Sequence, residues 1–346
     1  MRPARPSSGR LPLVVAFVIE AVVCWTTTAR AVDQAAAPAR FETQKTKVTT
    51  IVDDLPQVGA IAVKPTGQAV LMIDGGSNAI EMIDPAEPTR RQRAVGPFGG
   101  GERPVAVACV DSITCAVVIR SGRDWAIKTY RLPAPGTEVD PASTLQSIQL
   151  GQARADEDAA IGVAVSPLRS WIVVAGLPAP MPPVIRGAIA GARIGGMSTR
   201  NCPRAADGKQ PEAGEGFAAS AVAISPSDEL VLFERSDSGA STDRLAMYST
   251  VGTTQLLSLD SGLPRVRAAA YAKETLWAVG GNPADEQFPE GLWRLDAAIQ
   301  DRRQVVRPVC VARLAAPVAV ASLSNGRLLV VHGGPQRTVS VVEPAP

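Results

Sequence analysis

The residues that could do chemistry stand where runs of apolar residues end. A charged or imidazole side chain closes such a run at Asp74, Arg120, Glu234, Arg235 and His332. If these runs are strands that converge around an axis, their ends could together form a small binding mouth. The same side chains would serve equally well as solvated strand ends, so the sequence leaves both interpretations open.

Catalysis finds little support among these residues. His332 is the only histidine, and imidazole is a common general base because its pKa lies near neutrality. However, His332 directly precedes two glycines, and no carboxylate partner for it can be recognised in the sequence. The chain also lacks a G-x-S-x-G elbow, an H-E-x-x-H zinc motif and a C-x-x-C-H haem motif. We therefore predict no catalytic residue and favour a protein that is not an enzyme.

Metal and cofactor sites are not indicated either. A single histidine excludes a multi-histidine metal site. The glycine cluster at 98–103 (FGGGER) lacks the Lys-Ser/Thr and the following helix of a phosphate-binding loop. Asp53-Asp54 and Asp237-Ser238 offer oxygen ligands, but neither has the alternating spacing of a calcium loop. We predict no metal and no cofactor, with calcium left open.

The N-terminus has the three parts of a secretory signal peptide. Three arginines precede an apolar run from Leu11 to Trp25, and Ala29-Arg30-Ala31 provides an A-x-A cleavage site. The run is shorter than the roughly 20 residues that a membrane-spanning helix needs, and it contains Glu20. We expect residues 1–31 to be a signal peptide cleaved after Ala31, with a retained N-terminal anchor as the alternative. The mature chain would then be periplasmic or secreted, without a transmembrane span.

An oxidising compartment would favour disulfides. The mature chain keeps four cysteines, Cys109, Cys115, Cys202 and Cys310. Cys109 and Cys115 flank a short hairpin connection, so a cross-hairpin bond is one candidate, which would leave Cys202 and Cys310 as the other pair. Three connectivities exist in principle. Zinc binding is the rival interpretation, but no C-x-x-C and no nearby histidine support it.

The charge balance limits the partners. The chain has 35 Lys+Arg against 33 Asp+Glu, and without residues 1–31 the counts become 31 and 32. A mature domain this close to neutrality gives no electrostatic footprint for nucleic acid. Arginine far outnumbers lysine and alanine is abundant, which is typical of proteins from high-GC bacterial genomes.

The body of the chain repeats a short strand-like motif in which small residues alternate with β-branched ones. Successive copies are about 45 to 60 residues apart, which suits four short strands and their turns. The six copies are 59–63 (GAIAV), 104–108 (PVAVA), 161–165 (IGVAV), 221–224 (AVAI), 266–271 (VRAAAY) and 317–321 (PVAVA).

Turns and further strands follow most copies. The turn sequences are 64–67 (KPTG), 166–169 (SPLR), 225–228 (SPSD) and 324–326 (SNG), each leading into an apolar strand. Six units of four strands predict an all-β fold, a single β-propeller with six blades, although seven blades remain open. Residues 47–52 (KVTTIV) precede the first unit and could supply the missing outer strand of the last blade. We expect a flexible leader at 32–46 and the propeller domain at 47–346.

One long stretch, 178–216, interrupts the repeat. It is rich in Pro and Gly, and part of it, including 184–189 (VIRGAI), must supply outer strands of the third blade. The rest is predicted to be a long insertion, which is either a partner-binding loop or a spacer.

The units resemble bacterial YVTN-type and quinoprotein-like β-propeller repeats. The residues that carry the resemblance are 61–67 (IAVKPTG), 163–167 (VAVSP), 222–226 (VAISP) and 99–107 (GGGERPVAV). The resemblance implies a shape rather than an activity.

We therefore predict a secreted or periplasmic propeller that binds a protein partner and acts as a scaffold. A metal-dependent, lactonase-like hydrolase working at the channel mouth is the alternative, and it requires acidic and amide side chains from several blades to converge. A quinoprotein-like dehydrogenase is a third hypothesis, which the low aromatic content of 4% disfavours.

Overall fold

The computed structural model describes residues 40–41, 46–56, 58–67, 69–73, 77–134, 136–154, 161–199, 218–235, 242–249, 255–300 and 302–344. In this part of the chain, the regular structure is β-strand except for a 3-10 turn at Pro141–Ser143. Everything described lies within the unit formed by residues 36–346. None of the described segments forms a helix long and apolar enough to cross a membrane. The predicted signal peptide, residues 1–31, lies outside the described residues.

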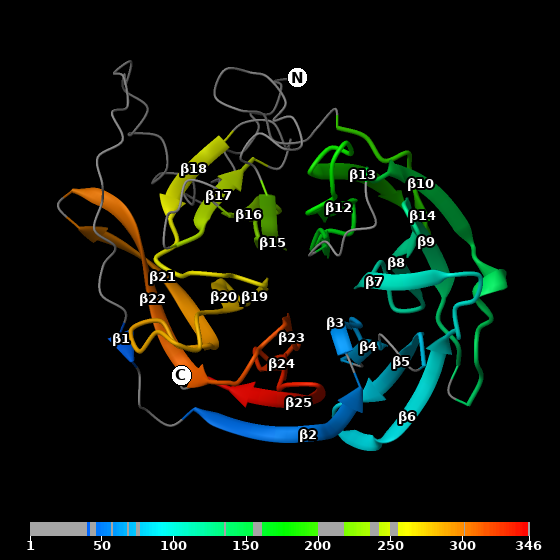
Figure 1. The fold of residues 1–346 in the computed structure, drawn as a ribbon, viewed down its shortest axis with the longest axis horizontal. Helices are drawn as coiled ribbons and strands as arrows, with labels where there is room; N and C mark the ends of the chain where they lie inside the picture. Colours follow the sequence, from blue (N-terminus) through cyan, green and yellow to red (C-terminus); the bar gives the residue numbers. More distant parts are fainter. Residues whose placement is uncertain are drawn as a thin grey trace, which may run out of the picture. The chain divides into compact units, whose positions relative to one another are not determined.

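Six antiparallel sheets follow one another along the chain and surround a common axis (Figure 1). Blade 1 consists of β3 (Val58–Val63), β4 (Ala69–Ile73), β5 (Ala79–Asp84) and β6 (Glu87–Val95). Blade 2 consists of β7 (Glu102–Cys109), β8 (Thr114–Ser121), β9 (Asp124–Arg131) and β10 (Gln146–Gln152). Blade 3 consists of β11 (Gly162–Val165), β12 (Trp171–Ala175), β13 (Val184–Ala190) and β14 (Arg193–Ile194).

The remaining blades complete the ring. Blade 4 consists of β15 (Ala218–Ile224), β16 (Leu230–Arg235), β17 (Arg244–Tyr248) and β18 (Gln255–Asp260). Blade 5 consists of β19 (Ala268–Ala272), β20 (Thr275–Gly280), β21 (Gly291–Gln300) and β22 (Arg303–Arg313). Blade 6 consists of β23 (Ala319–Ser322), β24 (Leu328–His332), β25 (Gln336–Glu343) and β2 (Lys47–Pro56). The predicted six-bladed propeller is confirmed for the described chain.

The ring closes through β2, the strand that directly precedes the first blade, as the sequence predicts. β2 pairs antiparallel with β25, so that Lys47 lies opposite Glu343 and Val48 lies opposite Val342. The inner strands β23 and β3 also contact each other, which joins the last blade to the first. Opening the ring therefore requires the loss of a complete strand pairing.

One buried apolar cluster fills each of the six contacts between neighbouring blades. Strand β8 shows how the sequence builds two of them. Because side chains alternate between the faces of a strand, Val117 and Ile119 pack toward blade 1 while Ala116 and Val118 pack toward blade 3. A uniformly apolar strand is thus covered on both faces.

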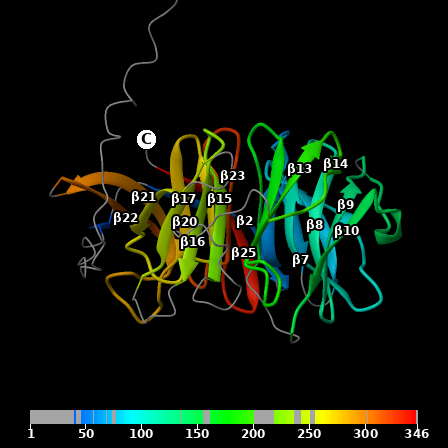
Figure 2. The ribbon, with the colours of Figure 1, turned by 90° about the horizontal axis from the view of Figure 1, so that it is seen from above.

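Three features of the outer strands differ from the expectations or go beyond them. The hairpin of β21 and β22 is longer than its counterparts and projects outward from the ring (Figure 2). Within the expected flexible leader, β1 (Arg40–Phe41) pairs in parallel with Val309 and Cys310 of β22. In blade 3, the predicted strand at 184–189 is the third strand, β13, and the fourth strand β14 has only two residues. The rest of the predicted insertion, from 200 to 216, lies outside the described residues.

Candidate binding site

Tight turns connect the inner strand of each blade to its second strand, and they gather at one end of the ring. Four of them close through a backbone hydrogen bond from the fourth residue to the first, at 2.8–2.9 Å. The fourth residues are Gly67, Arg169, Asp228 and Gly326, and all four have positive φ. A left-handed residue at this position turns the chain back into the second strand, which glycine does at the least cost.

Arg169 and Asp228 adopt the left-handed conformation although they are not glycine, and both side chains bind a neighbouring blade. The Arg169 guanidinium donates to the carbonyl oxygen of Val110 in blade 2 at 2.5 Å. The Trp171 indole donates to the Asp228 carboxylate in blade 4 at 2.7 Å, in a buried position. These turns therefore hold adjacent blades together as well as reversing the chain.

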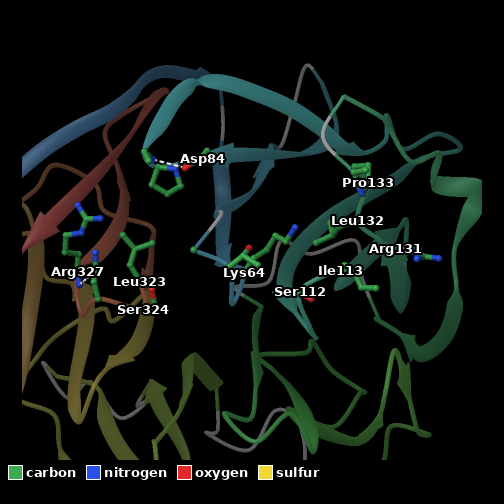
Figure 3. A pocket seen from close by; sticks show the side chains of 16 residues that line it. Lys64, Asp84, Ser112, Ile113, Arg131, Leu132, Pro133, Leu323, Ser324 and Arg327 are labelled. Atoms are coloured by element: carbon green, nitrogen blue, oxygen red, sulfur yellow. Dashed lines mark hydrogen bonds between the residues drawn. The ribbon is translucent and has the colours of Figure 1, made fainter.

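A pocket of about 750 Å³ lies among the turns of blades 6, 1 and 2 (Figure 3). Its walls come from the β3–β4, β5–β6, β7–β8 and β23–β24 turns and from the segment after β9. The lining residues are Lys64, Thr66, Gly67, Asp84, Pro85, Ala86, Ser112, Ile113, Arg131, Leu132, Pro133, Ala134, Leu323, Ser324, Asn325 and Arg327.

Cationic side chains outnumber acidic ones in this pocket. Lys64 lies in its middle, with Arg327 of blade 6 on one side and Arg131 of blade 2 on the other (Figure 3). Lys64 is 7% exposed, and its ammonium lies 3.6 Å from the Met82 sulfur. Arg131 is exposed at the rim. The three cations are therefore distributed across the whole breadth of the pocket.

The acidic groups near the pocket already have partners. Asp84, the one acidic residue in the lining, accepts a hydrogen bond from the Ala86 backbone N–H at 2.9 Å within its own turn. Glu343 pairs with Arg327 at 3.5 Å, with both side chains 42% exposed. An exposed pair at this distance is weak, so Arg327 can exchange Glu343 for another carboxylate at little cost. The pocket is thus suited to a ligand that carries negative charge.

The wall formed by the β7–β8 turn is rigidly held. The Ile113 N–H donates to the Asp111 carboxylate at 2.7 Å, and the Ile113 carbonyl accepts from the Leu132 N–H at 2.6 Å. Together with the Arg169 contact to Val110, these bonds fix the turn from within and from blade 3. The pocket wall at Ser112 and Ile113 is accordingly formed before any ligand binds.

The residues predicted from the sequence as mouth candidates lie at the other ends of the second strands. Arg120 is the second-to-last residue of β8 and lies opposite Trp125, Glu234 and Arg235 end β16, and His332 ends β24. They belong to blades 2, 4 and 6, which alternate around the ring, so the structure brings together only the neighbours Glu234 and Arg235. Asp74 lies outside the described residues. A binding role for this set stays a prediction.

Glu234 lies between blades 3 and 4. Its carboxylate accepts from the Arg244 guanidinium at 2.9 Å and from the Tyr248 hydroxyl at 3.1 Å. Burial raises the pKa of Glu234, while Arg244 and the Tyr248 hydrogen bond oppose that rise. The tyrosine ring reaches this carboxylate across the small side chain of Ala246, which is fully buried.

His332 also makes a local contact. A ring nitrogen lies 2.9 Å from the hydroxyl of Ser340 on the adjacent strand. Burial lowers the pKa of His332, so the buried position favours the neutral form of the imidazole. Among the described residues, no carboxylate forms an ion pair or hydrogen bond with this imidazole.

The described residues test the cysteine and metal predictions only in part. Cys109, Cys115 and Cys310 are buried free thiols, and Cys202 lies outside the described residues. Within the described ranges, no three His, Cys, Asp or Glu side chains come together as a metal site. Asp53 and Asp54 are exposed on β2, and Asp237-Ser238 is not described.

Sequence reasoning missed the pocket. The one available signal was Lys64, which occupies the position that serine holds in the equivalent turns 166–169 and 225–228. A lysine at that place in a repeat departs from the pattern, but its neighbours in the pocket come from blades whose proximity only the closed ring creates.

Comparisons with known proteins support the fold alone. No protein-family profile matches the chain, and no curated protein matches its sequence. Among solved structures, an oxidoreductase described as a glucose dehydrogenase from Thermus thermophilus is 15% identical, with a TM-score of 0.58 over 86% of this chain and 100% of its own. The PQQ-bound aldose sugar dehydrogenase from Streptomyces coelicolor is 15% identical, with a TM-score of 0.55 over 89% and 100%. A luciferin-regenerating enzyme is 10% identical, with a TM-score of 0.52 over 86% and 95%.

These likenesses agree with the predicted resemblance to quinoprotein-like propellers at the level of the fold. Nothing in them bears on the YVTN type. Because the similar structures carry different activities, the shared shape does not select one.

Proposed function

We propose that this protein is a binding propeller that takes an acidic, extended segment of a partner protein into the pocket between blades 6, 1 and 2. The observation that carries the proposal is the row formed by Arg327, Lys64 and Arg131 across that pocket. A cationic pocket on a molecule whose positive and negative charges nearly balance favours a localised charge contact over a diffuse one.

The spacing of the cations favours an extended segment over a compact anion. Arg327 and Arg131 lie on opposite sides of the pocket, with Lys64 between them, which favours a separate carboxylate for each guanidinium group. Acidic side chains along an extended chain could pair with the rim arginines while the chain crosses Lys64. Arginine suits this task because its planar guanidinium binds carboxylates with two hydrogen bonds.

A cofactor-dependent activity has less support. One of the structurally similar enzymes was solved with PQQ bound, and a quinone cofactor would need polar groups that converge on one space. The described inner strands carry mainly Ala, Val and Ile, and the polar ends of the second strands lie on separate blades. These residues do not fit such a cofactor, and we derive no step through it. The metal-dependent hydrolase likewise gains no support from the described residues.

Charge reversal at the rim tests the proposal. We expect Arg131→Glu to weaken binding of a fluorescein-labelled glutamate-rich peptide at least about tenfold, because one cation–carboxylate contact becomes a repulsion. Fluorescence anisotropy at several salt concentrations would measure this affinity, and the dependence on salt should be shallower in the variant.

The matched control is Arg303→Glu, which changes the same charge on an exposed residue of the projecting hairpin in blade 5. Its affinity should equal that of the unchanged protein. Equal binding of a glutamine-rich peptide, or equal losses in the two variants, would show that the pocket does not recognise acidic segments. Binding of citrate but not of the peptide would assign the pocket to a small carboxylate instead.

A further inference from the structure

The cysteines at the base of the pocket-forming hairpin lie directly opposite each other. In the register of β7 and β8, Cys109 faces Cys115 and the next pair is Ala108 with Ala116. Directly opposed residues of an antiparallel pair project to the same face of the sheet. Both side chains accordingly belong to the same buried cluster between blades 1 and 2.

The hydrogen-bond pattern shows which kind of pair this is. The Val110 N–H donates to the Thr114 carbonyl at 2.9 Å, so Val110 and Thr114 form a hydrogen-bonded pair. Because the two kinds of pair alternate, Cys109 and Cys115 form a non-hydrogen-bonded pair, whose Cα atoms are typically about 4.5 Å apart. That spacing falls within the range of about 4.4–6.8 Å that a disulfide spans.

The third described cysteine has no comparable position. Cys310 lies on β22, in the cluster between blades 4 and 5. The position of Cys109 and Cys115 in another cluster makes them partners of each other rather than of Cys310.

The Cys109 and Cys115 thiols are free in this structure, and we propose that they join as a cross-strand disulfide in the mature protein. Two thiols would lose two protons and two electrons to a disulfide-bearing oxidant, which becomes a dithiol, and one S–S bond would form. The bond would link β7 to β8 next to the turn that carries Ser112 and Ile113. Whether the disulfide forms does not depend on the proposed function. Only the consequence of the bond for ligand binding, through the pocket wall at Ser112 and Ile113, rests on that function.

The burial of the two thiols determines at which stage of folding the disulfide can form. Burial raises the pKa of Cys109 to about 12, an effect that the nearby Lys64 and Arg169 partly oppose. Burial also raises the pKa of the Cys115 thiol, and the neighbouring Cys109 adds to the rise. Since the thiolate is the reacting species, exchange in the folded protein would be slow. The disulfide would therefore form before blade 2 packs against blade 1, and would then resist reductants.

Peptide mapping tests the proposal without any ligand. The chain from residue 32 to 346 would be refolded with oxidised and reduced glutathione, alkylated under denaturing conditions and digested with trypsin. Residues 94–120 form one tryptic peptide that contains both cysteines, because Pro104 blocks cleavage after Arg103. We expect this peptide to be unalkylated and lighter by two hydrogens than the reduced peptide.

Two further measurements complete the test. Dithiothreitol should leave the bond intact in the folded protein and cleave it in urea, and reduction should lower the urea midpoint. The Cys109→Ala/Cys115→Ala variant should lose the part of this change that the cross-strand bond causes, whereas Cys310→Ala should still give the unalkylated 94–120 peptide. Alkylation of both thiols after oxidative refolding, or a bond from either one to Cys202 or Cys310, would overturn the proposal. Binding of the glutamate-rich peptide would also be measured with the fully reduced protein. If the disulfide is absent but the peptide binds, the disulfide proposal fails while the proposed function stands.

Discussion

Single residues in this propeller act mainly between blades. Asp228 of blade 4 accepts a hydrogen bond from the Trp171 indole of blade 3, and Arg169 of blade 3 donates to the Val110 carbonyl of blade 2. Glu234, by contrast, contacts Arg244 and Tyr248 within its own sheet. The sequence predicts the chain reversal at 225–228 from its Ser-Pro-Ser-Asp pattern, but the pattern does not reveal that the aspartate serves a tryptophan of another blade. Such contacts depend on distances that the ring sets, not on local sequence.

The raised pKa of Glu234 predicts a pH dependence of stability. Between its usual pKa and its raised folded pKa, the unfolded chain is ionised while the folded protein still holds the proton. The free energy of unfolding should therefore decrease as the pH rises through this interval, by on the order of 1.4 kcal/mol per unit of difference. In Glu234→Gln that decrease should be smaller, as measured by urea unfolding between pH 4 and 8.

Glu87→Gln is the control for that series, since Glu87 has a side chain 65% exposed and pairs only weakly with Arg90 at 3.6 Å. Its pH profile should match that of the unchanged protein. If the pH profile of Glu234→Gln also matched that of the unchanged protein, the raised pKa of the buried Glu234 carboxylate would be contradicted.

The strands themselves follow the sequence closely where the pattern is purely apolar. The inner strands and most second strands were predicted because alanine alternates with valine or isoleucine, and the turn residues mark where each strand ends. The sequence does not predict β22, because Arg307 and Pro308 interrupt the alternation of apolar and polar residues along it. The strand forms by pairing with β21 over most of its length. The pocket could not be predicted, since it is assembled from turns of three blades that are distant in the sequence.

The contribution of strand β2 to the stability of the closed ring can be tested by substitution. Leu55 is 1% exposed and packs between blades 6 and 1, whereas Val48 on the same strand is 42% exposed. We expect Leu55→Ala to lower the free energy of unfolding by about 2–5 kcal/mol, because a buried leucine leaves a cavity. Val48→Ala, measured by the same urea titration, should cost less than about 1 kcal/mol. Equal effects would mean that β2 does not contribute to the core.

At the scale of the whole ring, the propeller is a rigid frame, and the residues on its surface determine what it binds. Six buried clusters hold the blades in place, so the pocket among blades 6, 1 and 2 keeps its shape without a partner. The solved propellers with similar folds carry more than one activity, which is what a frame of this kind allows. A ligand of matching charge, rather than the fold, is what would define this protein's role.

Photo-crosslinking from within the pocket tests this account most directly. A benzophenone side chain placed at Ile113, which lines the pocket and is 50% exposed, would be compared with one at Ile299, 76% exposed on the blade 5 hairpin. In an extract of the native cells, we expect one partner to crosslink at position 113 and not at 299, and an excess of the glutamate-rich peptide to abolish the product. A product that forms at 299 alone, or one at 113 that the acidic peptide does not reduce, would contradict the assignment of the pocket as an acidic-segment binding site.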